Sequence, residues 1–384
     1  MRSLIKLKKK IATLNVGVKS EYEDFFEFPD FANYANTKDK LDVVFILLRE
    51  AQPELKGTKV GSTTLGDGQL SFINNNYKVI VDYREKQIKV TASVMMTTKQ
   101  FLGKKLRSLY RLYSYEYESM DARLSRGFIY YVINPVLQLM FVRNGTSFIH
   151  GSTISYKGNN AYLFTGWGGS GKTSTSSALL FDDKNYKFIS DDLAIINEHK
   201  NVFNNPAISH IYPYNVVGFE TLENNILKGK SFIERLHWSL RKRYMGMNKV
   251  RRRVDPNLIY SVNDKVGLLS SKVFYFMRSD AKSIEHRSLT SKELVQMSIN
   301  VTYHEIKGLT EIFSSMYSIA KNELRSQNEY SGFSQIFGVD NDYFEKLNAI
   351  YTQYFDGQDM YYINVPKKTA PKELRDYLTS NELL

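Results

Sequence analysis

The stretch over residues 161–173 constrains the fold of this chain most. Residues 161–165 form an apolar run that predicts a buried strand, and they lead into a segment that fits G-x-x-x-x-G-K-[ST] at every fixed position. That segment consists of Gly166, Trp167, Gly168, Gly169, Ser170, Gly171, Lys172 and Thr173. Residues 173–180 are rich in Ser, Thr and Ala and predict a helix. A strand, a glycine-rich loop and a helix in this order are the context that a phosphate-binding loop requires.

The residue types in the loop explain this expectation. Glycine lets the backbone turn tightly, so that successive N–H groups can point at phosphate oxygens without interference from side chains. Lys172 supplies a positive charge for β- and γ-phosphates, and the Thr173 hydroxyl is placed to bind Mg²⁺. The helix that follows presents its N-terminus to the anion. We therefore expect residues 166–174, which end at Ser174, to bind the cofactor.

Composition limits the classes of protein to consider. The chain has 384 residues, of which 42% are apolar, enough for two domains or one large domain with a packed core. The longest apolar stretch, residues 128–142, is too short for an ordinary membrane span and predicts a buried helix interrupted or restarted at Pro135. Cysteine is absent, which excludes disulfides and thiolate metal sites. With no recognisable signal peptide, we expect a cytoplasmic protein without a membrane span.

A net charge of +12 favours anionic partners such as nucleotides, acidic proteins or peptides, nucleic acid or a membrane surface. Part of the charge is concentrated in two basic triplets, at residues 241–243 and 251–253. This segment is interpreted either as a solvated loop, or as a lid over phosphates or a docking surface for an acidic substrate. No motif for reading nucleic acid is present, so a nucleic-acid partner is not expected.

The N-terminal region predicts an α+β arrangement. Leu41, Val44, Phe45 and Leu48 follow helical spacing and predict a helix over residues 38–51. Short alternating segments at residues 69–73, 77–83 and 88–93 predict an antiparallel meander. Residues 99–115 mix basic, aromatic and leucine residues and predict one helix.

The chain around the glycine-rich loop predicts a compact unit. Residues 147–156 and 161–165 predict a hairpin joined by a tight turn, and residues 186–190 predict a strand that ends in Asp191 and Asp192 before a further apolar segment at 193–197. Adjacent side chains on a regular strand point to opposite faces. A bend at the strand end would bring both carboxylates to one site, or divide them between metal binding and proton abstraction.

This arrangement resembles the HPr kinase/phosphorylase family, whose nucleotide core is shared with phosphoenolpyruvate carboxykinases. The residues that carry the resemblance are His150-Gly151, the hairpin, the loop over residues 166–173, and Phe188-Ile189-Ser190-Asp191-Asp192. Weaker similarity covers a proline-containing segment at residues 211–214, strands at 273–277 and 361–366, and a final helix at 371–378. Residues 1–140 resemble no family that we can name.

The resemblance implies an ATP- and Mg²⁺-dependent kinase that transfers the γ-phosphate to a hydroxyl, most often Ser or Thr of a protein or peptide, and otherwise of a small hydroxylated molecule. In that interpretation Lys172 neutralises the β- and γ-phosphates, and Thr173 holds Mg²⁺. One of Asp191 and Asp192 accepts the hydroxyl proton while the other assists the metal, with Asp192 preferred as the base. His150 orients the acidic pair or the phosphate. The alternative is a nucleotide-dependent regulatory or binding module without phosphotransfer.

The implied architecture is an α/β fold with a mixed sheet, in which residues 144–384 form a P-loop kinase core of the HPr kinase/phosphoenolpyruvate carboxykinase type. Residues 1–143 form an N-terminal α+β region for substrate recognition or assembly. A basic insertion lies at about residues 220–257, and Arg241 and Arg251 within it are candidates for phosphate contact. One departure is Ser174, where the bacterial enzymes place an acidic residue. The resemblance also implies self-association into homo-oligomers.

Overall fold

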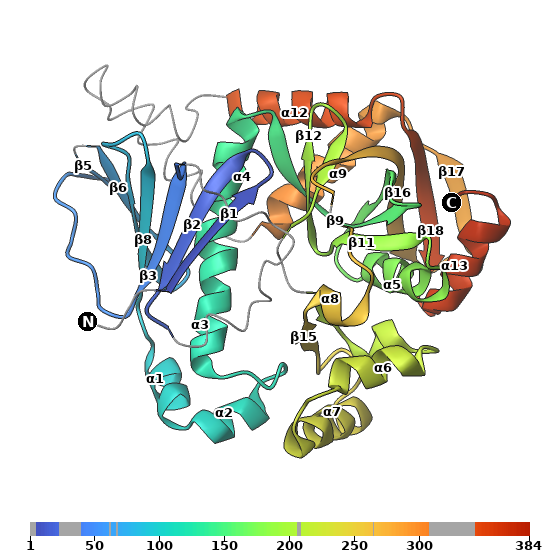
Figure 1. Cartoon of the computed structure of the whole chain (residues 1–384), viewed down its shortest axis with the longest axis horizontal. Coiled ribbons are helices and arrows are strands. Elements are labelled where there is room, and N and C mark those ends of the chain that lie inside the picture. The colour runs from blue at the N-terminus through green and yellow to red at the C-terminus, as the bar shows by residue number, and fades with distance from the viewer. Residues whose placement is uncertain are drawn as a thin grey trace. The chain divides into compact units, whose positions relative to one another are not determined.

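The computed structural model describes residues 5–22, 40–60, 63–66, 68–205, 209–263, 265–306 and 342–384. They form two compact units. The first contains the described residues up to Tyr110, Glu118–Ser147 and those within Tyr303–Ala349; the second contains Arg111–Tyr117, Phe148–Thr302 and Ile350–Leu384. Each unit combines helices with a mixed sheet (Figure 1), so the predicted mixed α/β class is confirmed. The units alternate along the sequence, whereas the sequence predicts one boundary near residue 143.

The first unit contains an eight-stranded sheet in the order β1-β2-β3-β8-β7-β6-β5-β4. Its strands are β1 (Ile5–Ile11), β2 (Leu14–Ser20), β3 (Val43–Leu48), β4 (Thr58–Val60), β5 (Thr63–Gly66), β6 (Gln69–Asn74), β7 (Tyr77–Asp82) and β8 (Ile88–Val94). Strands β6, β7 and β8 pair antiparallel in sequence order. The predicted meander is therefore confirmed.

The helix predicted over residues 38–51 is wrong. Residues 38 and 39 lie outside the described residues, and Val43–Leu48 is the strand β3, which pairs in parallel with β2 and β8. Val43, Phe45 and Leu47 are fully buried, and the intervening Val44 and Ile46 are buried as well. A strand buried on both faces shows no alternation of polar and apolar residues, so its apolar run also satisfies helical spacing.

Four helices follow β8: α1 (Thr98–Lys105), α2 (Arg107–Tyr113), α3 (Met120–Phe128) and α4 (Asn134–Arg143). The single helix predicted over residues 99–115 is thus two helices, because Leu106 leaves the helical conformation at φ −96° and ψ 50°. A π-helical turn, Ile129–Ile133, joins α3 to α4, and Pro135 lies in the first turn of α4, where its missing N–H is tolerated. The predicted buried helix is confirmed, but it is not interrupted at Pro135, because Ile133 and Asn134 keep helical φ and ψ angles.

The second unit contains the other eight-stranded sheet. Its strands are β9 (Thr146–Tyr156), β10 (Asn160–Gly166), β11 (Tyr186–Ser190), β12 (Leu193–Asn197), β13 (Asn201–Phe203), β16 (Leu268–Ser279), β17 (Glu285–Ser288) and β18 (Asp359–Pro366). β9 and β10 form the predicted hairpin, and β16 pairs in parallel with both β10 and β18. The strands predicted at residues 186–190, 273–277 and 361–366 are confirmed, and the apolar segment at residues 193–197 forms β12.

The remaining elements are α5 (Lys172–Asp182), the short pair β14 (Ser209–Ile211) and β15 (Arg252–Val254), the 3₁₀-helix Pro213–Val216, α6 (Glu220–Leu227), α7 (Phe232–Tyr244), α8 (Pro256–Ile259), α9 (Ser291–Glu305), α12 (Asp342–Phe355) and α13 (Pro371–Ser380). The predicted insertion at about residues 220–257 is mainly helical, and the predicted final helix is α13. None of the helices in the described part of the chain has both the length and the apolar character needed to cross a bilayer.

Helix α5 packs between two apolar clusters of the second unit. On one side Leu179 packs in a cluster with apolar residues of the sheet and with Leu374 of α13. Helices α5 and α13 lie side by side in Figure 1. On the other side Ala178 packs with β11 and with Leu222 of α6. Burial of one such leucine contributes about 1.5–3 kcal/mol. The helix that follows the glycine-rich loop is therefore fixed from both sides.

Candidate active site

The glycine-rich loop lies at the carboxyl edge of the parallel strands. β10 ends at Gly166, which pairs with Phe276 of β16, and Phe276 in turn pairs with Ile363 of β18. In sheets with parallel strands, ligands bind beyond the carboxyl ends of the strands. The sequence motif thus occupies the position in the fold where such a site is expected.

Glycine is required at several positions of the loop. Gly166, Gly169 and Gly171 have φ values of 127°, 76° and 110°, which other residues rarely adopt. A Cβ atom at Gly166 would also lie 2.3 Å from the carbonyl oxygen of Phe276, whereas one at Gly169 would meet no atom within 4 Å. The need for glycine is therefore steric and conformational at Gly166, but purely conformational at Gly169.

Lys172 begins α5, and its side chain crosses back over the loop. The buried Nζ atom donates hydrogen bonds to the carbonyl oxygens of Gly166, at 2.8 Å, and Trp167, at 2.9 Å. The N-cap residue, Gly171, provides no side-chain cap, and the first turn of α5 contains no acidic residue. The positive end of the helix dipole and the Lys172 ammonium therefore both contribute positive potential at the loop, which attracts anions.

Asp191 is held against the start of α5. It follows the last residue of β11, and its Oδ1 atom accepts a hydrogen bond of 2.8 Å from the Thr173 hydroxyl. Burial raises the pKa of Asp191 to about 6, and the adjacent charge of Asp192 adds to the increase, while the Thr173 hydrogen bond opposes it. A hydroxyl and a carboxylate are thus brought together beside the glycine-rich loop, as a divalent cation would need.

Asp192 adopts a left-handed conformation, with φ of 68°. Its carbonyl oxygen accepts a hydrogen bond from the Gly151 N–H at 3.0 Å, which fixes the bend after β11 to strand β9. The side chain is 43% exposed, whereas Asp191 is 5% exposed. Positive φ in a residue other than glycine is strained, and such strain clusters at functional sites. The predicted bend is present, and it gives the two carboxylates different access to solvent.

His150 lies on β9 and faces the acidic pair. Its Nδ1 atom is 3.8 Å from Oδ1 of Asp192. Its backbone is held on both sides, because its N–H donates to the Thr302 hydroxyl at 3.1 Å and its carbonyl accepts from the Thr165 hydroxyl at 2.8 Å. Burial and the nearby Lys172 charge hold the pKa of His150 well below its usual range. The imidazole is therefore neutral at neutral pH.

Ser174, the residue after Thr173, has a structural partner. The buried side chain of Asn215 donates a hydrogen bond of 2.8 Å to its hydroxyl, and the Oδ1 atom of Asn215 accepts from the Tyr212 N–H. Asn215 belongs to the 3₁₀-helix Pro213–Val216, which begins within the proline-containing segment. The segment at residues 211–214 is thus fastened to the first turn of α5.

Sequence reasoning missed Arg278, which belongs to the same edge of the sheet. It lies near the carboxyl end of β16, and its Nη2 atom is 3.5 Å from the position that a Cβ atom would take at Gly171. Its Nη1 atom donates to the carbonyl oxygens of Pro366, at 3.2 Å, and Lys367, at 2.6 Å. One signal was available, because the basic residue directly follows the strand predicted at residues 273–277.

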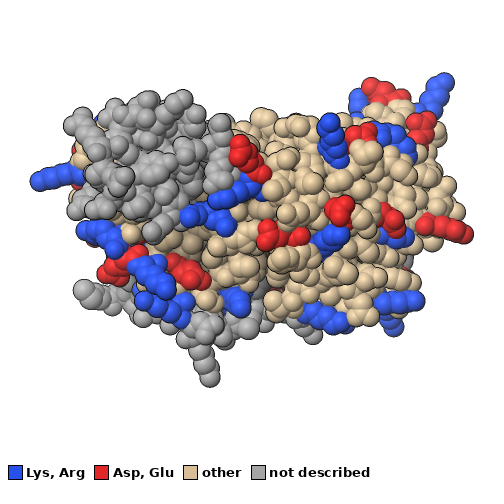
Figure 2. Space-filling view, turned by 90° about the horizontal axis from the view of Figure 1, so that it is seen from above, with Lys and Arg blue, Asp and Glu red and all other residues tan. Residues whose placement is uncertain are grey.

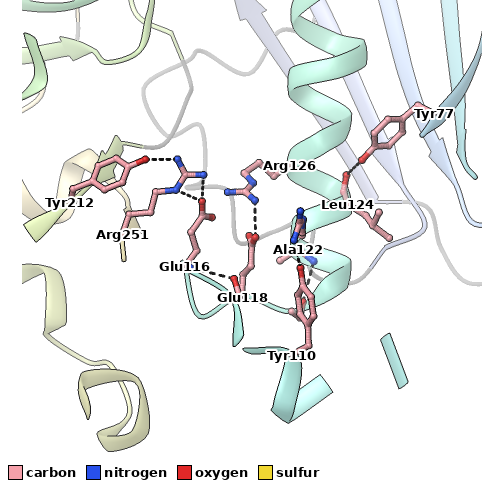
Figure 3. A network of polar contacts seen from close by, with 12 residues as sticks. Tyr77, Tyr110, Glu116, Glu118, Ala122, Leu124, Arg126, Tyr212 and Arg251 are labelled. Atoms are coloured by element: carbon pink, nitrogen blue, oxygen red, sulfur yellow. Dashed lines mark hydrogen bonds and ion pairs between the residues drawn. The ribbon is translucent and has the colours of Figure 1, made fainter. Parts of the chain in front are cut away.

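The two arginines that the sequence singled out in the insertion have protein partners. Arg251 forms an ion pair with Glu116 and donates a hydrogen bond of 2.8 Å to the Tyr212 hydroxyl (Figure 3). Arg241 donates to the backbone carbonyls of Leu112 and Tyr113. These contacts assign structural roles to both guanidinium groups in the second unit.

The basic charge of the insertion is partly neutralised within the protein. Lys242 pairs with Glu223, and the buried Arg252 pairs with Glu234. Figure 2, which views another face than that of the insertion, likewise shows Lys and Arg side chains among Asp and Glu over the described residues. The alternative of a merely solvated basic loop therefore does not describe this segment, because part of it is paired and buried.

The donor set at the loop suits Mg²⁺ bound together with phosphates. Mg²⁺ is usually held by one or two carboxylates and by phosphate oxygens. Thr173, Asp191 and Asp192 match this pattern, and among the described residues no group of three or more His, Cys, Asp or Glu could hold a metal ion by itself. No protein-family model matches the chain, and no curated protein matches it significantly in sequence.

Proposed function

We propose that this protein is an ATP- and Mg²⁺-dependent kinase with an HPr kinase-like core, and that it transfers the γ-phosphate to a hydroxyl of Ser or Thr in a protein or peptide, or of a small molecule. The observation that carries the proposal is the hydrogen bond between Thr173 and Asp191 at the first turn of α5. In the proposal this hydroxyl and this carboxylate bind the metal ion, beside a loop whose glycines and lysine suit a polyphosphate.

In this proposal Thr173 and Asp191 hold the metal ion, and Lys172 with the loop N–H groups holds the β- and γ-phosphates. Bound Mg²⁺ supplies positive charge that neutralises the phosphate oxygens. Asp191 has to be ionised to bind the cation, and its raised pKa of about 6 allows this at neutral pH. The positions of these groups are fixed by α5, which is packed on both sides.

Asp192 is the base of the proposed reaction. Its side chain is more exposed than that of Asp191, so the hydroxyl of a substrate can reach it from the solvent side. The carboxylate accepts the hydroxyl proton as the hydroxyl oxygen bonds to the γ-phosphorus and the bond to the ADP oxygen breaks. His150, which is neutral, lies beside Asp192 and limits the positions that its carboxylate can take.

The proposal is tested by incubating the purified protein with γ-labelled ATP, Mg²⁺ and a peptide library or a cell extract. Transfer of label to another molecule is expected from the unmodified protein and not from Lys172→Ala or Asp192→Asn. Lys187→Ala and Asp356→Asn are matched controls, because both residues are exposed and lie outside the loop and the acidic pair.

Two other outcomes would contradict the kinase proposal. Binding of ATP without transfer would favour the nucleotide-dependent regulatory module instead. Hydrolysis of ATP that depends on added DNA or RNA would point to a nucleic-acid-associated ATPase.

A further inference from the structure

Arg278 has a partly buried guanidinium that forms no ion pair with a carboxylate among the described residues. Arg251 and Arg252 form ion pairs with Glu116 and Glu234. The guanidinium of Arg278 instead contacts the carbonyl oxygens of Pro366 and Lys367, through Nη1 alone. Its Nε atom is buried and has no hydrogen-bond partner among the described residues. A partly buried cation without a counter-charge is unfavourable unless an anion binds beside it.

The pKa of Arg278 reflects burial without a nearby carboxylate partner among the described residues. Burial lowers its pKa, and the group that opposes this effect is the phenol of Tyr214. Burial, followed by Tyr212 and Asp191, raises the pKa of Tyr214 to about 12, so its phenol is neutral under ordinary conditions. A bound anion would supply the counter-charge that these neighbours do not.

The free side of this guanidinium faces the glycine-rich loop. Its Nη2 atom is near Gly171, which is the N-cap residue of α5 and carries no side chain. The Ser170 hydroxyl in the same loop is buried and has no hydrogen-bond partner among the described residues. The guanidinium thus approaches a helix N-terminus whose preceding residue carries an unsatisfied hydroxyl.

We propose that Arg278 binds phosphate at the glycine-rich loop, as a second cationic ligand besides Lys172. A guanidinium presents two N–H groups in a planar fork that matches two phosphate oxygens, whereas an ammonium acts as a point charge. The ligand class is a nucleoside di- or triphosphate. The assignment rests on the proposed function, because the ligand is taken to be the polyphosphate of that nucleotide.

Binding of Mg-ADP, Mg-ATP and inorganic pyrophosphate to the full chain, measured by calorimetry, tests the proposal. Arg278→Gln is expected to weaken all three by about 10- to 100-fold, as loss of charge-assisted hydrogen bonds does. Arg278→Lys keeps the positive charge but not the planar pair of N–H groups. Its affinity for the three ligands is expected to lie between those of the unmodified protein and of Arg278→Gln. Arg287→Gln is the matched control, because Arg287 is on β17 and pairs with the exposed Glu293.

The unfolding temperature without ligand separates binding from a structural role. If Arg278 binds phosphate, Arg278→Gln loses affinity while its unliganded form unfolds within a few degrees of the unmodified protein. If Arg278 only ties the end of β18 through the Pro366 and Lys367 carbonyls, the unliganded variant unfolds at lower temperature and the folded fraction binds normally. That second result overturns the proposal.

The same titrations distinguish this proposal from the kinase proposal. Loss of binding in Lys172→Ala together with normal binding in Arg278→Gln would refute the role of Arg278 and leave the nucleotide site standing. Weakened binding in Arg278→Gln without phosphate transfer by the unmodified protein would support Arg278 and contradict the kinase proposal. If the unmodified protein binds none of the three ligands, both proposals fail.

Discussion

The hydroxyl of Thr173 donates a hydrogen bond of 2.8 Å to the Oδ1 atom of Asp191. Thr173 lies in the first turn of α5 and Asp191 directly follows β11, so one bond connects the start of the helix with the end of the strand. The bond also lowers the pKa that burial raises in Asp191. The protonation of Asp191 is therefore coupled to the start of α5, directly after the glycine-rich loop.

We expect Asp191→Asn to stabilise the metal-free protein at neutral pH. The pKa of Asp191 rises from 3.8 to about 6 on folding, so the folded state binds this proton more tightly than the unfolded state. Stability is lost as the pH rises from about 4 to about 6, and the loss is complete above that range. Asparagine is uncharged throughout, and should raise the free energy of unfolding at pH 7.5 by ~1–3 kcal/mol.

Urea unfolding at several pH values measures this effect. The gain from Asp191→Asn should disappear at pH 4, where the unmodified carboxyl is protonated. Asp356→Asn, at an exposed carboxylate, serves as the control. A gain of the same size at every pH would show that ionisation of Asp191 is not its source.

Thr173→Val should abolish the contribution of Mg²⁺ to ADP binding, and Thr173→Ser should preserve it. Valine has nearly the shape of threonine but lacks the hydroxyl that donates a hydrogen bond to Asp191. Serine keeps this hydroxyl. Loss of the donor also raises the pKa of Asp191 further, which opposes cation binding in the same direction. Calorimetry with Mg-ADP and with metal-free ADP between pH 5.5 and pH 8 gives the comparison; equal Mg²⁺ dependence in Thr173→Val would refute the role of Thr173.

Gly166→Ala should destabilise the second unit strongly. Its Cβ atom would meet the Phe276 carbonyl oxygen at 2.3 Å, and backbone atoms of two paired strands cannot easily separate. Overpacking of this kind, together with an unfavourable φ, costs about 3 kcal/mol or more. Gly158→Ala is the matched control, because Gly158 has a φ of 71° but no atom within 4 Å of the added Cβ, and the expected loss is only about 1 kcal/mol. Similar losses in both variants, measured by chemical unfolding, would argue against the steric explanation.

Asn215→Ala should lower the free energy of unfolding by about 1–3 kcal/mol, because it leaves the buried Ser174 hydroxyl and the Tyr212 N–H without their partner. Asn224→Ala, at an exposed position of α6, should change it by less than about 0.5 kcal/mol. Asn215→Ala should also weaken nucleotide binding, since Asn215 fastens its segment to the first turn of α5. Unfolding by urea and ADP titration give the two values, and an unchanged stability would show that this hydrogen bond is dispensable.

The sequence was most informative where a local pattern decides the structure. The strand before the glycine-rich loop, the loop and the helix after it occupy consecutive residues, and each has its own signal in residue type and spacing. The bend at Asp191 and Asp192 could also be anticipated, because two adjacent carboxylates cannot share a face of a regular strand. Their different exposure could not, since it depends on the contact between Asp192 and Gly151 across two strands.

The misassigned and missed residues depend on neighbours that are distant in sequence. Val43–Leu48 is a strand because β2 and β8 cover both of its edges, which the apolar run alone does not reveal. Arg278 reaches the glycine-rich loop because β16 pairs in register with β10. Sequence spacing gives the period of a segment, but the register between separate segments is set by packing in the folded chain.

The position of β18 affects when this site can form during synthesis. β10 is made early and β16 much later, and the edge beside the glycine-rich loop also requires β18 and the carbonyls of Pro366 and Lys367 that hold Arg278. A nascent chain emerges from the ribosome amino end first, and domains generally fold as units. The loop therefore leaves the ribosome well before its supporting strands, and a chaperone that binds the growing polypeptide would meet β10 and α5 while their apolar surfaces are still uncovered.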